Sequence, residues 1–265
     1  MTPEDHVKAG DPQGALDALQ ALVRVRPGDA KLRIFLFQLL CVMGDWTRAI
    51  RQLKLCGELD PGALQMAQAY REAIICEVYR EKVFAGEKAP LVFGEPQEWL
   101  AWLIEAQNLL SAGNAAAAAD LRGKAFDAAP ASAGEFDGKT FEWIADADMR
   151  FGPVLEAVVN GRYLWLPFAQ ISKIIFDPPT DLRDAVWTAA TITLANGGAV
   201  VALIPTRYPS SGQTGTAAEK LARATSWTDL GAGTFAGTGQ RLLSTDQGDV
   251  ALMDARLITF NGAMS

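Results

Sequence analysis

Three segments of this chain open with one pattern, glycine, then aspartate or asparagine, then alanine at the sixth position: GDPQGA at residues 10–15, GDWTRA at 44–49 and GNAAAA at 113–118. A proline follows 17 positions after each leading glycine, at Pro27, Pro61 and Pro130, and the first two copies lie 34 residues apart. This period, with a small residue in the second helix and a proline after it, is typical of tetratricopeptide repeats. Such repeats are stacked helical hairpins with a concave surface, so the first function to consider is binding another protein.

Helix-start signals recur through the first 130 residues. Aspartate before proline, as in Asp11-Pro12, predicts a helix start, because the carboxylate caps free N–H groups and proline suits the first helical position. We expect helices that start at Pro12, at Asp29 (to Leu40), at Asp45, at Asp60-Pro61 (to about Phe84), at Gly94-Glu95-Pro96 and at Asn114 (115–128). Together they predict a compact right-handed superhelix.

Strand patterns replace helical spacing after Pro130. Residues 131–138 have the small residues of a linker, and Asn160-Gly161 between residues 154–159 and 162–166 predicts a β-hairpin. We also expect a hairpin of residues 188–194 and 200–204, a short helix at 217–224, a glycine-rich loop at 231–239 and a final strand pair at 241–244 and 250–260. The predicted fold is multidomain: a tetratricopeptide-like α–α superhelix over residues 1–130, then a mostly antiparallel, β-rich α+β domain over residues 131–265.

The composition disfavours two classes of partner. The net charge is −7 and no cluster of lysine or arginine stands out, which disfavours nucleic-acid binding because that requires phosphate neutralisation. No apolar run reaches the roughly 18–20 residues that span a bilayer, and the first twenty residues lack the basic start of a signal peptide. We therefore expect a cytoplasmic protein without membrane insertion.

The supply of catalytic and metal-binding side chains is small. His6 is the one histidine of the chain, which disfavours triads and histidine-based zinc sites. Cys41, Cys56 and Cys76 form no C-x-x-C pair, and we expect them to be buried thiols. Two loose nucleotide motifs, at residues 133–140 and 231–236, lack the helix that a phosphate site requires, so we interpret both as turns or loops and expect no cofactor.

Residues of the β-rich half are the candidates for partner contacts. Arginine, tyrosine and tryptophan are favoured at protein–protein hot spots, and aspartate at the rim sets orientation. The candidates are Trp143, Asp146, Asp148, Arg150, Arg162, Tyr163, Trp165, Arg207 and Tyr208. An alternative is that Asp146, Asp148 and Arg150 bind a small ligand or serve a hydrolytic reaction. Asp146-x-Asp148 has no third ligand at a recognised spacing, so we expect these carboxylates to cap turns or pair with Arg150, with no metal.

Five sequence motifs, which occur in a fixed order along the chain, resemble those of a known family. They are FEWIADxDxRFGPVLE (141–156), NGRYxWxP (160–167), PxDLRD (179–184), IPxRYP (204–209) and GQRxL (239–243). With the helical repeats before them, they resemble the ImpE family, also called SciE or TagJ, over about residues 10–260. These are accessory proteins of bacterial type VI secretion.

The resemblance implies a non-catalytic cytoplasmic adaptor built from a helical superhelix and an α+β domain. It implies that the partner is the N-terminal helix of the small contractile-sheath subunit, with a possible link to the ClpV-type ATPase that recycles the sheath. A structural alternative is that the β-rich half only caps the repeat stack, with Trp99 and Trp102 in the seam.

Overall fold

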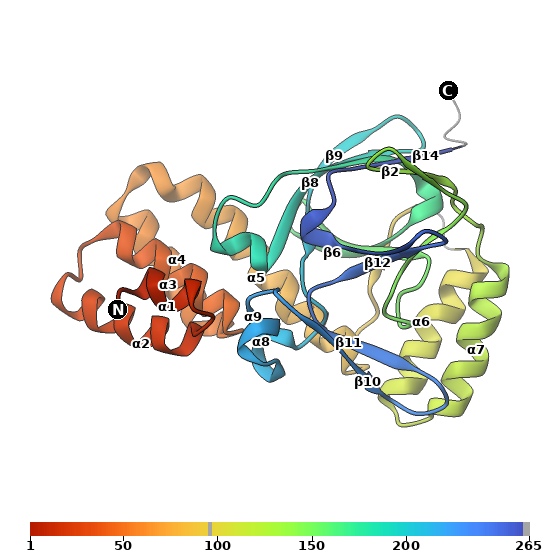
Figure 1. Ribbon diagram of the computed structural model, residues 1–265, viewed down its shortest axis with the longest axis horizontal. Coiled ribbons are helices and arrows are strands. Elements are labelled where there is room, and N and C mark those ends of the chain that lie inside the picture. Colours follow the sequence, from red (N-terminus) through yellow and green to blue (C-terminus); the bar gives the residue numbers. More distant parts are fainter. Residues whose placement is uncertain (95–96, 262–265) are drawn as a thin grey trace.

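The N-terminal part is a stack of capped helices, as the repeats predict. The computed structural model describes residues 1–94 and 97–261. The stack contains α1 (Pro3–Lys8), α2 (Pro12–Val25), α3 (Ala30–Val42), α4 (Trp46–Leu59) and, after a 3-10 turn at Pro61–Ala63, α5 (Leu64–Phe84). Asp11, Asp29 and Asp45 each accept a hydrogen bond from a backbone N–H of the helix that follows. The predicted starts of α2, α3 and α4 are therefore confirmed (Figure 1).

The leading glycine of each repeat has a conformational role. Gly10, Gly44 and Gly113 have φ angles of +81°, +70° and +82°, a region that L-residues with a side chain rarely adopt. Each glycine ends one helix and directs the chain into the next, which explains why the same residue stands at the same place in all three phrases.

The third repeat does not continue the stack. Its helices, α6 (Glu98–Ser111) and α7 (Ala115–Ala128), pack on each other at the opposite end of the molecule from α1–α4 (Figure 1). Between α5 and α6 the chain first adds the short strand β1 (Leu91–Val92), which pairs parallel with β6. A compact superhelix of six helices is thus not formed. Of the predicted start at Gly94-Glu95-Pro96, the last two residues lie outside the described part, and Asn114 makes no side-chain cap.

A nine-stranded sheet forms the centre of the second part. Its strand order is β1-β6-β5-β9-β8-β7-β14-β2-β3, and all its pairs except β1–β6 are antiparallel. The strands after β1 are β2 (Gly134–Phe136), β3 (Lys139–Phe141), β5 (Val154–Val159), β6 (Arg162–Pro167), β7 (Ile171–Phe176), β8 (Trp187–Leu194), β9 (Ala199–Pro205) and β14 (Leu257–Phe260). The mostly antiparallel sheet confirms the predicted fold class.

Two smaller sheets flank the main one. β4 (Ile144–Asp146), β12 (Leu242–Thr245) and β13 (Gly248–Ala251) form the first, and the ribbon of β10 (Thr225–Asp229) and β11 (Phe235–Gly239) forms the second. The remaining elements are the short helices α8 (Ser211–Thr214) and α9 (Ala217–Lys220) and 3-10 turns at Phe168–Gln170, Leu182–Ala185 and Leu252–Asp254.

Both predicted hairpins, β5–β6 and β8–β9, are confirmed, and Asn160 and Gly161 have the positive φ angles that their turn requires. The short helix predicted at 217–224 is present as α9, although it already ends at Lys220. Three other local predictions were wrong. The expected linker contains β2, and the expected loop at 231–239 contains β11. The segment 250–260 is divided, because β13 pairs with β12 whereas β14 joins β7 and β2 in the main sheet. Residues 133–140 form the β2–β3 hairpin, with no helix after them.

The β-rich part fills the inner side of the helical stack. Val186, Trp187 and Leu221 share one apolar core with residues of α2–α5. Trp99 of α6 packs in another core with Phe151 and Trp165, and Trp102 is partly buried against it. The two halves are therefore joined by continuous packing, with both predicted seam tryptophans in it. Among the described helices, none combines the length and apolar character needed to cross a bilayer.

Candidate functional site

Glu156 lies at the centre of a buried charge network between the two halves. Its carboxylate accepts hydrogen bonds from Nε and Nη2 of Arg80 at 2.7 and 2.6 Å, and further bonds from Arg241 and the Tyr163 hydroxyl. Arg80 comes from α5 and Glu156 from β5. In turn, Arg80 pairs with Glu77 at 3.2 Å. Because a buried charge is stable only when it is paired, this network fixes how the helical stack meets the sheet.

The two aspartates predicted from Asp146-x-Asp148 belong to the same buried region. Asp146 pairs with Arg241, and Asp148 pairs with Arg150 and accepts the Gly237 N–H at 2.8 Å. The pairing of Asp148 with Arg150 is thus confirmed. Arginines already neutralise both carboxylates, so neither is presented to a substrate, and residues 1–94 and 97–261 hold no group of three potential metal-binding His, Cys, Asp or Glu side chains. The arrangement gives no support to the ligand-binding or hydrolytic alternative.

Burial and neighbouring charges move the pKa values of these carboxyl groups in opposite directions. Burial raises the pKa of Glu156, but Arg80 and Arg241 outweigh it and hold that pKa below its ordinary value. Burial raises the pKa of Asp146 to about 7, because its one arginine partner offsets the loss of hydration only in part. Glu156 is therefore the anion on which the network depends most.

Arg207 joins the β-rich part to the end of a repeat helix. Its guanidinium donates hydrogen bonds to the carbonyl oxygens of Cys41 and Val42, at 3.1 and 2.7 Å, and to that of Lys220. The last carbonyls of a helix have no partner within the helix, so this arginine satisfies the C-terminus of α3. Burial lowers the pKa of Arg207 to about 10, and the neighbouring Glu77 offsets part of this effect.

The structure therefore places most of the predicted partner-binding residues in the interior. Asp146, Asp148, Tyr163, Trp165, Arg207 and Tyr208 are each 4% exposed or less. Arg150 is largely covered, with 11% of its side chain exposed, whereas Trp143 is 42% exposed and Arg162 also faces solvent. Both faces of β6 are covered, because Tyr163 and Trp165 face the helices while Leu166 faces the main β core. Arginines and aromatics that sequence patterns favour at hot spots here stabilise the joint between the halves.

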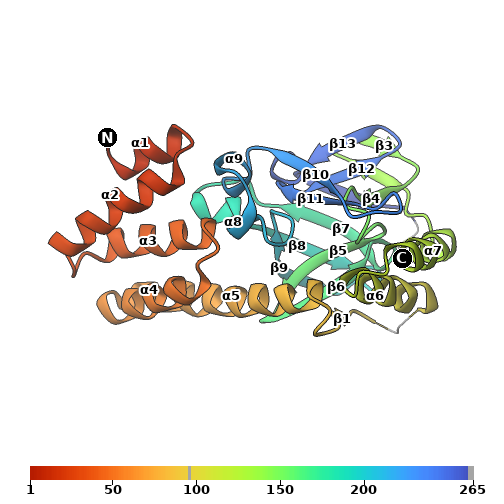
Figure 2. The same ribbon diagram turned by 90° about the horizontal axis from the view of Figure 1, so that it is seen from below.

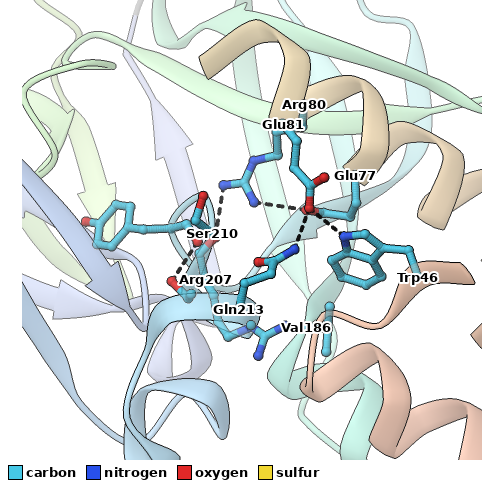
Figure 3. A pocket seen from close by; sticks show the side chains of 11 residues that line it. Trp46, Glu77, Arg80, Glu81, Val186, Arg207, Ser210 and Gln213 are labelled. Atoms are coloured by element: carbon cyan, nitrogen blue, oxygen red, sulfur yellow. Dashed lines mark hydrogen bonds and ion pairs between the residues drawn. The ribbon is translucent and has the colours of Figure 1, made fainter. Parts of the chain in front are cut away.

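The cavity shown in Figure 3 belongs to this joint. Glu81 of α5 accepts hydrogen bonds from Nε1 of Trp46, at 2.6 Å, and from the Gln213 amide of α8. The space among these side chains is about 10 Å³, near the volume that holds a single water molecule. It is a contact between α4, α5 and α8, and it is too small for a ligand.

A larger hollow lies outside the joint, between α4 and α5. Its volume is about 520 Å³. We name it the α4–α5 groove and define it by its lining residues: Ile50, Leu53, Lys54, Gly57, Glu58, Leu64, Ala67, Gln68 and Arg71. Aliphatic side chains form much of this lining, and charged groups of both signs are present.

Sequence reasoning missed the α4–α5 groove, because it concentrated on the aromatic and charged residues of the β-rich half. The signal that was available is the spacing of Leu64 and Ala67 on α5 and of Ile50, Leu53 and Gly57 on α4. These are helical spacings, and they place one set of small and aliphatic residues on facing sides of two consecutive helices.

The comparisons with known proteins agree with both halves of the fold. Residues 138–259 match the family described as ImpE protein, and residues 6–71 match the tetratricopeptide repeat. A crystal structure of a protein from Vibrio parahaemolyticus superposes with a TM-score of 0.89, covers 97% of each chain and is 23% identical, which shows the shared fold.

A curated relative shows the family. The chain is 51% identical over 260 residues to the type VI secretion system accessory component TagJ of Pseudomonas aeruginosa, covering 98% of this chain and 91% of that protein. Together with the profile match over the β-rich half, this identity places the protein in the ImpE family, to which TagJ-type accessory components of type VI secretion belong.

Proposed function

We propose that this protein is a non-catalytic cytoplasmic adaptor of a type VI secretion system. Its partner is the N-terminal helix of the small contractile-sheath subunit, and binding assists sheath assembly or disassembly by a ClpV-type ATPase. The observation that carries the proposal is the α4–α5 groove on a tetratricopeptide-like scaffold, in a chain 51% identical to an accessory component of that system. A hollow of this kind suits the apolar side of an amphipathic helix.

The inner face of the repeats is filled by the chain itself, and this supports the choice of the α4–α5 groove. Tetratricopeptide repeats commonly bind ligands on their concave surface. Here the Trp187 ring packs against Trp46 of α4 and Tyr70 of α5, with ring centroids 6.1 and 5.6 Å apart, and occupies that side of the two helices. A helix from another protein then binds on the outer side, where Leu64 is 55% exposed.

A pull-down with the purified full chain tests the proposal. The bait is the sheath small subunit, with and without its first helix, and we expect binding that depends on that helix. The variant Leu64→Glu places a charge in the groove and is expected to weaken binding by at least about tenfold, in the range of an interface hot spot. Leu257→Glu is the matched control, because Leu257 is 40% exposed on β14. If the intact subunit does not retain the wild-type chain, the proposed function is rejected.

A further inference from the structure

The outer side of α5 carries a regular row of exposed residues. Leu64, Gln68, Arg71, Ile75, Val78 and Lys82 are separated by steps of four, three, four, three and four positions. We name this set the α5 row. At 3.6 residues per turn, these steps keep all six side chains on one side of the helix. The same alternation of steps forms the contact seam of a coiled coil.

The α5 row faces solvent along its whole length. Leu64, Ile75 and Val78 are 55%, 46% and 37% exposed, and Gln68, Arg71 and Lys82 are also exposed. The opposite side of the helix is buried, as shown by Ala73, Ile74 and Arg80. In Figure 2, α5 lies along the lower edge of the molecule with no other described element beneath it. A soluble helix normally shows polar residues on such a side, so three exposed aliphatic residues in register indicate a contact surface.

The row and the α4–α5 groove are one surface. Leu64, Gln68 and Arg71 are the first half of the row and also line the groove. From there Ile75, Val78 and Lys82 continue towards the C-terminal end of α5. At a rise of about 1.5 Å per residue, the row from Leu64 to Lys82 is about 27 Å long, which matches a partner helix of roughly 18 residues.

Charge along the row defines the chemistry of the partner. Arg71 and Lys82 take part in none of the ion pairs formed within residues 1–94 and 97–261. Of the nearby acids, Glu58 of the groove pairs with Lys54 at 3.8 Å, and Glu72 and Glu81 accept hydrogen bonds from the uncharged side chains of Gln68 and Trp46. The row therefore presents aliphatic side chains and two cations that form no ion pair within the described residues.

From this geometry we infer that the α5 row binds the partner helix lengthwise, in coiled-coil register. The inference rests on the proposed function and specifies the partner's pattern. That helix carries apolar residues at alternating steps of three and four, which pack against Leu64, Ile75 and Val78. It carries acidic residues at the flanks, which pair with Arg71 and Lys82. Arg71 and Lys82 stand in the seam itself, where a charged side chain sets register, and their long side chains reach carboxylates at the flanks of the partner helix.

Two synthetic helical peptides test the inference on the full chain. Both carry leucine at alternating steps of three and four over 21 residues; one has glutamate at the flanking positions and the other lysine. Fluorescence anisotropy is expected to show binding of the acidic peptide to the wild type and at least about tenfold weaker binding to Ile75→Glu. Ile175→Glu is the matched control, because Ile175 of β7 is 42% exposed, close to the 46% of Ile75.

A second pair of variants isolates charge without changing the apolar seam. Arg71→Glu is expected to weaken the acidic peptide and to strengthen the lysine peptide, whereas Arg24→Glu, on the exposed side of α2, leaves both unchanged. If Ile75→Glu fails to fold, the comparison of Arg71→Glu with Arg24→Glu still tests whether the α5 row binds the peptide. Absence of binding by the acidic peptide, or binding that neither Ile75→Glu nor Arg71→Glu reduces, would overturn the inference.

The sheath subunit separates this inference from the proposed function. If the sheath helix binds and Ile75→Glu binds it as the wild type does, the α5 row is not the site, although the adaptor function stands. If the acidic peptide binds through the α5 row and the sheath helix does not bind, the row stands and the sheath subunit is the wrong partner.

Discussion

Arg80 of α5 forms a bidentate ion pair with Glu156 of β5, although the two residues are 76 positions apart: Nε lies 2.7 Å from Oε1 and Nη2 lies 2.6 Å from Oε2. The Arg80 side chain is 4% exposed and that of Glu156 is fully buried. The pair connects the helical stack to the sheet, so the position of the α5 row relative to the β-rich part depends on it.

Neutralising Glu156 is expected to destabilise the protein strongly. In Glu156→Gln, Arg80 and Arg241 lose their shared anion in a buried site, where breaking such a pair costs about 3–5 kcal/mol. Chemical denaturation measures the change, and Glu135→Gln, at the exposed position of β2, is the control. Asp146→Asn is expected to cost less than Glu156→Gln, since burial already raises the pKa of Asp146 to about 7. A larger loss for Asp146→Asn would contradict this ranking.

The same network predicts how stability changes in acid. The pKa of Glu156 is lower in the folded protein than its ordinary value of 4.5, because Arg80 and Arg241 outweigh the effect of burial. The unfolded chain therefore binds a proton at Glu156 before the folded protein does. The contribution of Glu156 is present above about pH 4.5 and is lost as the pH falls through the folded pKa. Melting temperatures from pH 7 to pH 3 should fall more steeply for the wild type than for Glu156→Gln, and parallel curves would count against this role.

Removing the guanidinium of Arg207 is expected to loosen the end of α3. Arg207→Met removes the donor to the carbonyl oxygen of Val42, whereas that of Cys41 still accepts the Gly44 N–H at 3.1 Å. A hydrogen bond from a charged group contributes roughly 1.5–3 kcal/mol. We expect a loss of roughly 2–3 kcal/mol in the free energy of unfolding, with faster hydrogen exchange at residues 40–45. Arg24→Met, on the exposed side of α2, is the control. Unchanged exchange at those residues would show that α3 needs no such cap.

Two glycines in hairpin turns, Gly161 between β5 and β6 and Gly197 between β8 and β9, allow a matched comparison. Gly161 and Gly197 both have positive φ, +70° and +84°, so an alanine at either place is strained by roughly 1–2 kcal/mol. A Cβ at Gly161 would also lie 2.9 Å from Oε2 of Glu72 on α5, whereas nothing lies within 4 Å of one at Gly197. Gly161→Ala is therefore expected to lower the melting temperature more than Gly197→Ala. Equal effects would mean that Glu72 moves aside without cost.

A fragment of residues 1–130 is not expected to unfold cooperatively. Its α6–α7 hairpin would lose the packing of Trp99, Leu100 and Leu103 against Phe151 and Trp165. Circular dichroism during heating measures this directly, with the full chain as the reference. A sharp unfolding transition of the fragment would show instead that the helices need no cap from the β-rich part.

The repeats and hairpins were predictable because their signals are local. Asp11-Pro12 specifies a helix start, because the aspartate caps a backbone N–H and the proline ring suits the first helical position. Asn160-Gly161 specifies a hairpin turn, because both residues tolerate the positive φ angles that the turn requires. The separation of α6–α7 from the stack was not predictable in this way. It follows from β1, whose two residues pair with β6 across 73 positions, and from the core around Trp165. Such contacts join residues far apart in the chain, and neither local sequence contains a pattern that predicts them.

The burial of most candidate partner residues was not predictable for a related reason. Tyr163, Trp165, Arg207 and Tyr208 belong to residue types that are common both at interfaces and in buried polar networks, and composition does not separate the two. What separates them is the partner of each charge, such as Glu156 for Arg80. In contrast, the alternating spacing of three and four positions in the α5 row, from Leu64 to Lys82, is visible in the sequence. The structure was needed to show that this side of α5 is exposed and that the opposite side is buried.

The most direct test of the adaptor account is hydrogen–deuterium exchange of the full chain, alone and with the sheath small subunit. The account predicts slower exchange in α4 and α5, over residues 46–84, and little change at Trp143 and in the rest of the β-rich part. Protection confined to the β-rich part, or none anywhere at saturating subunit, would contradict it.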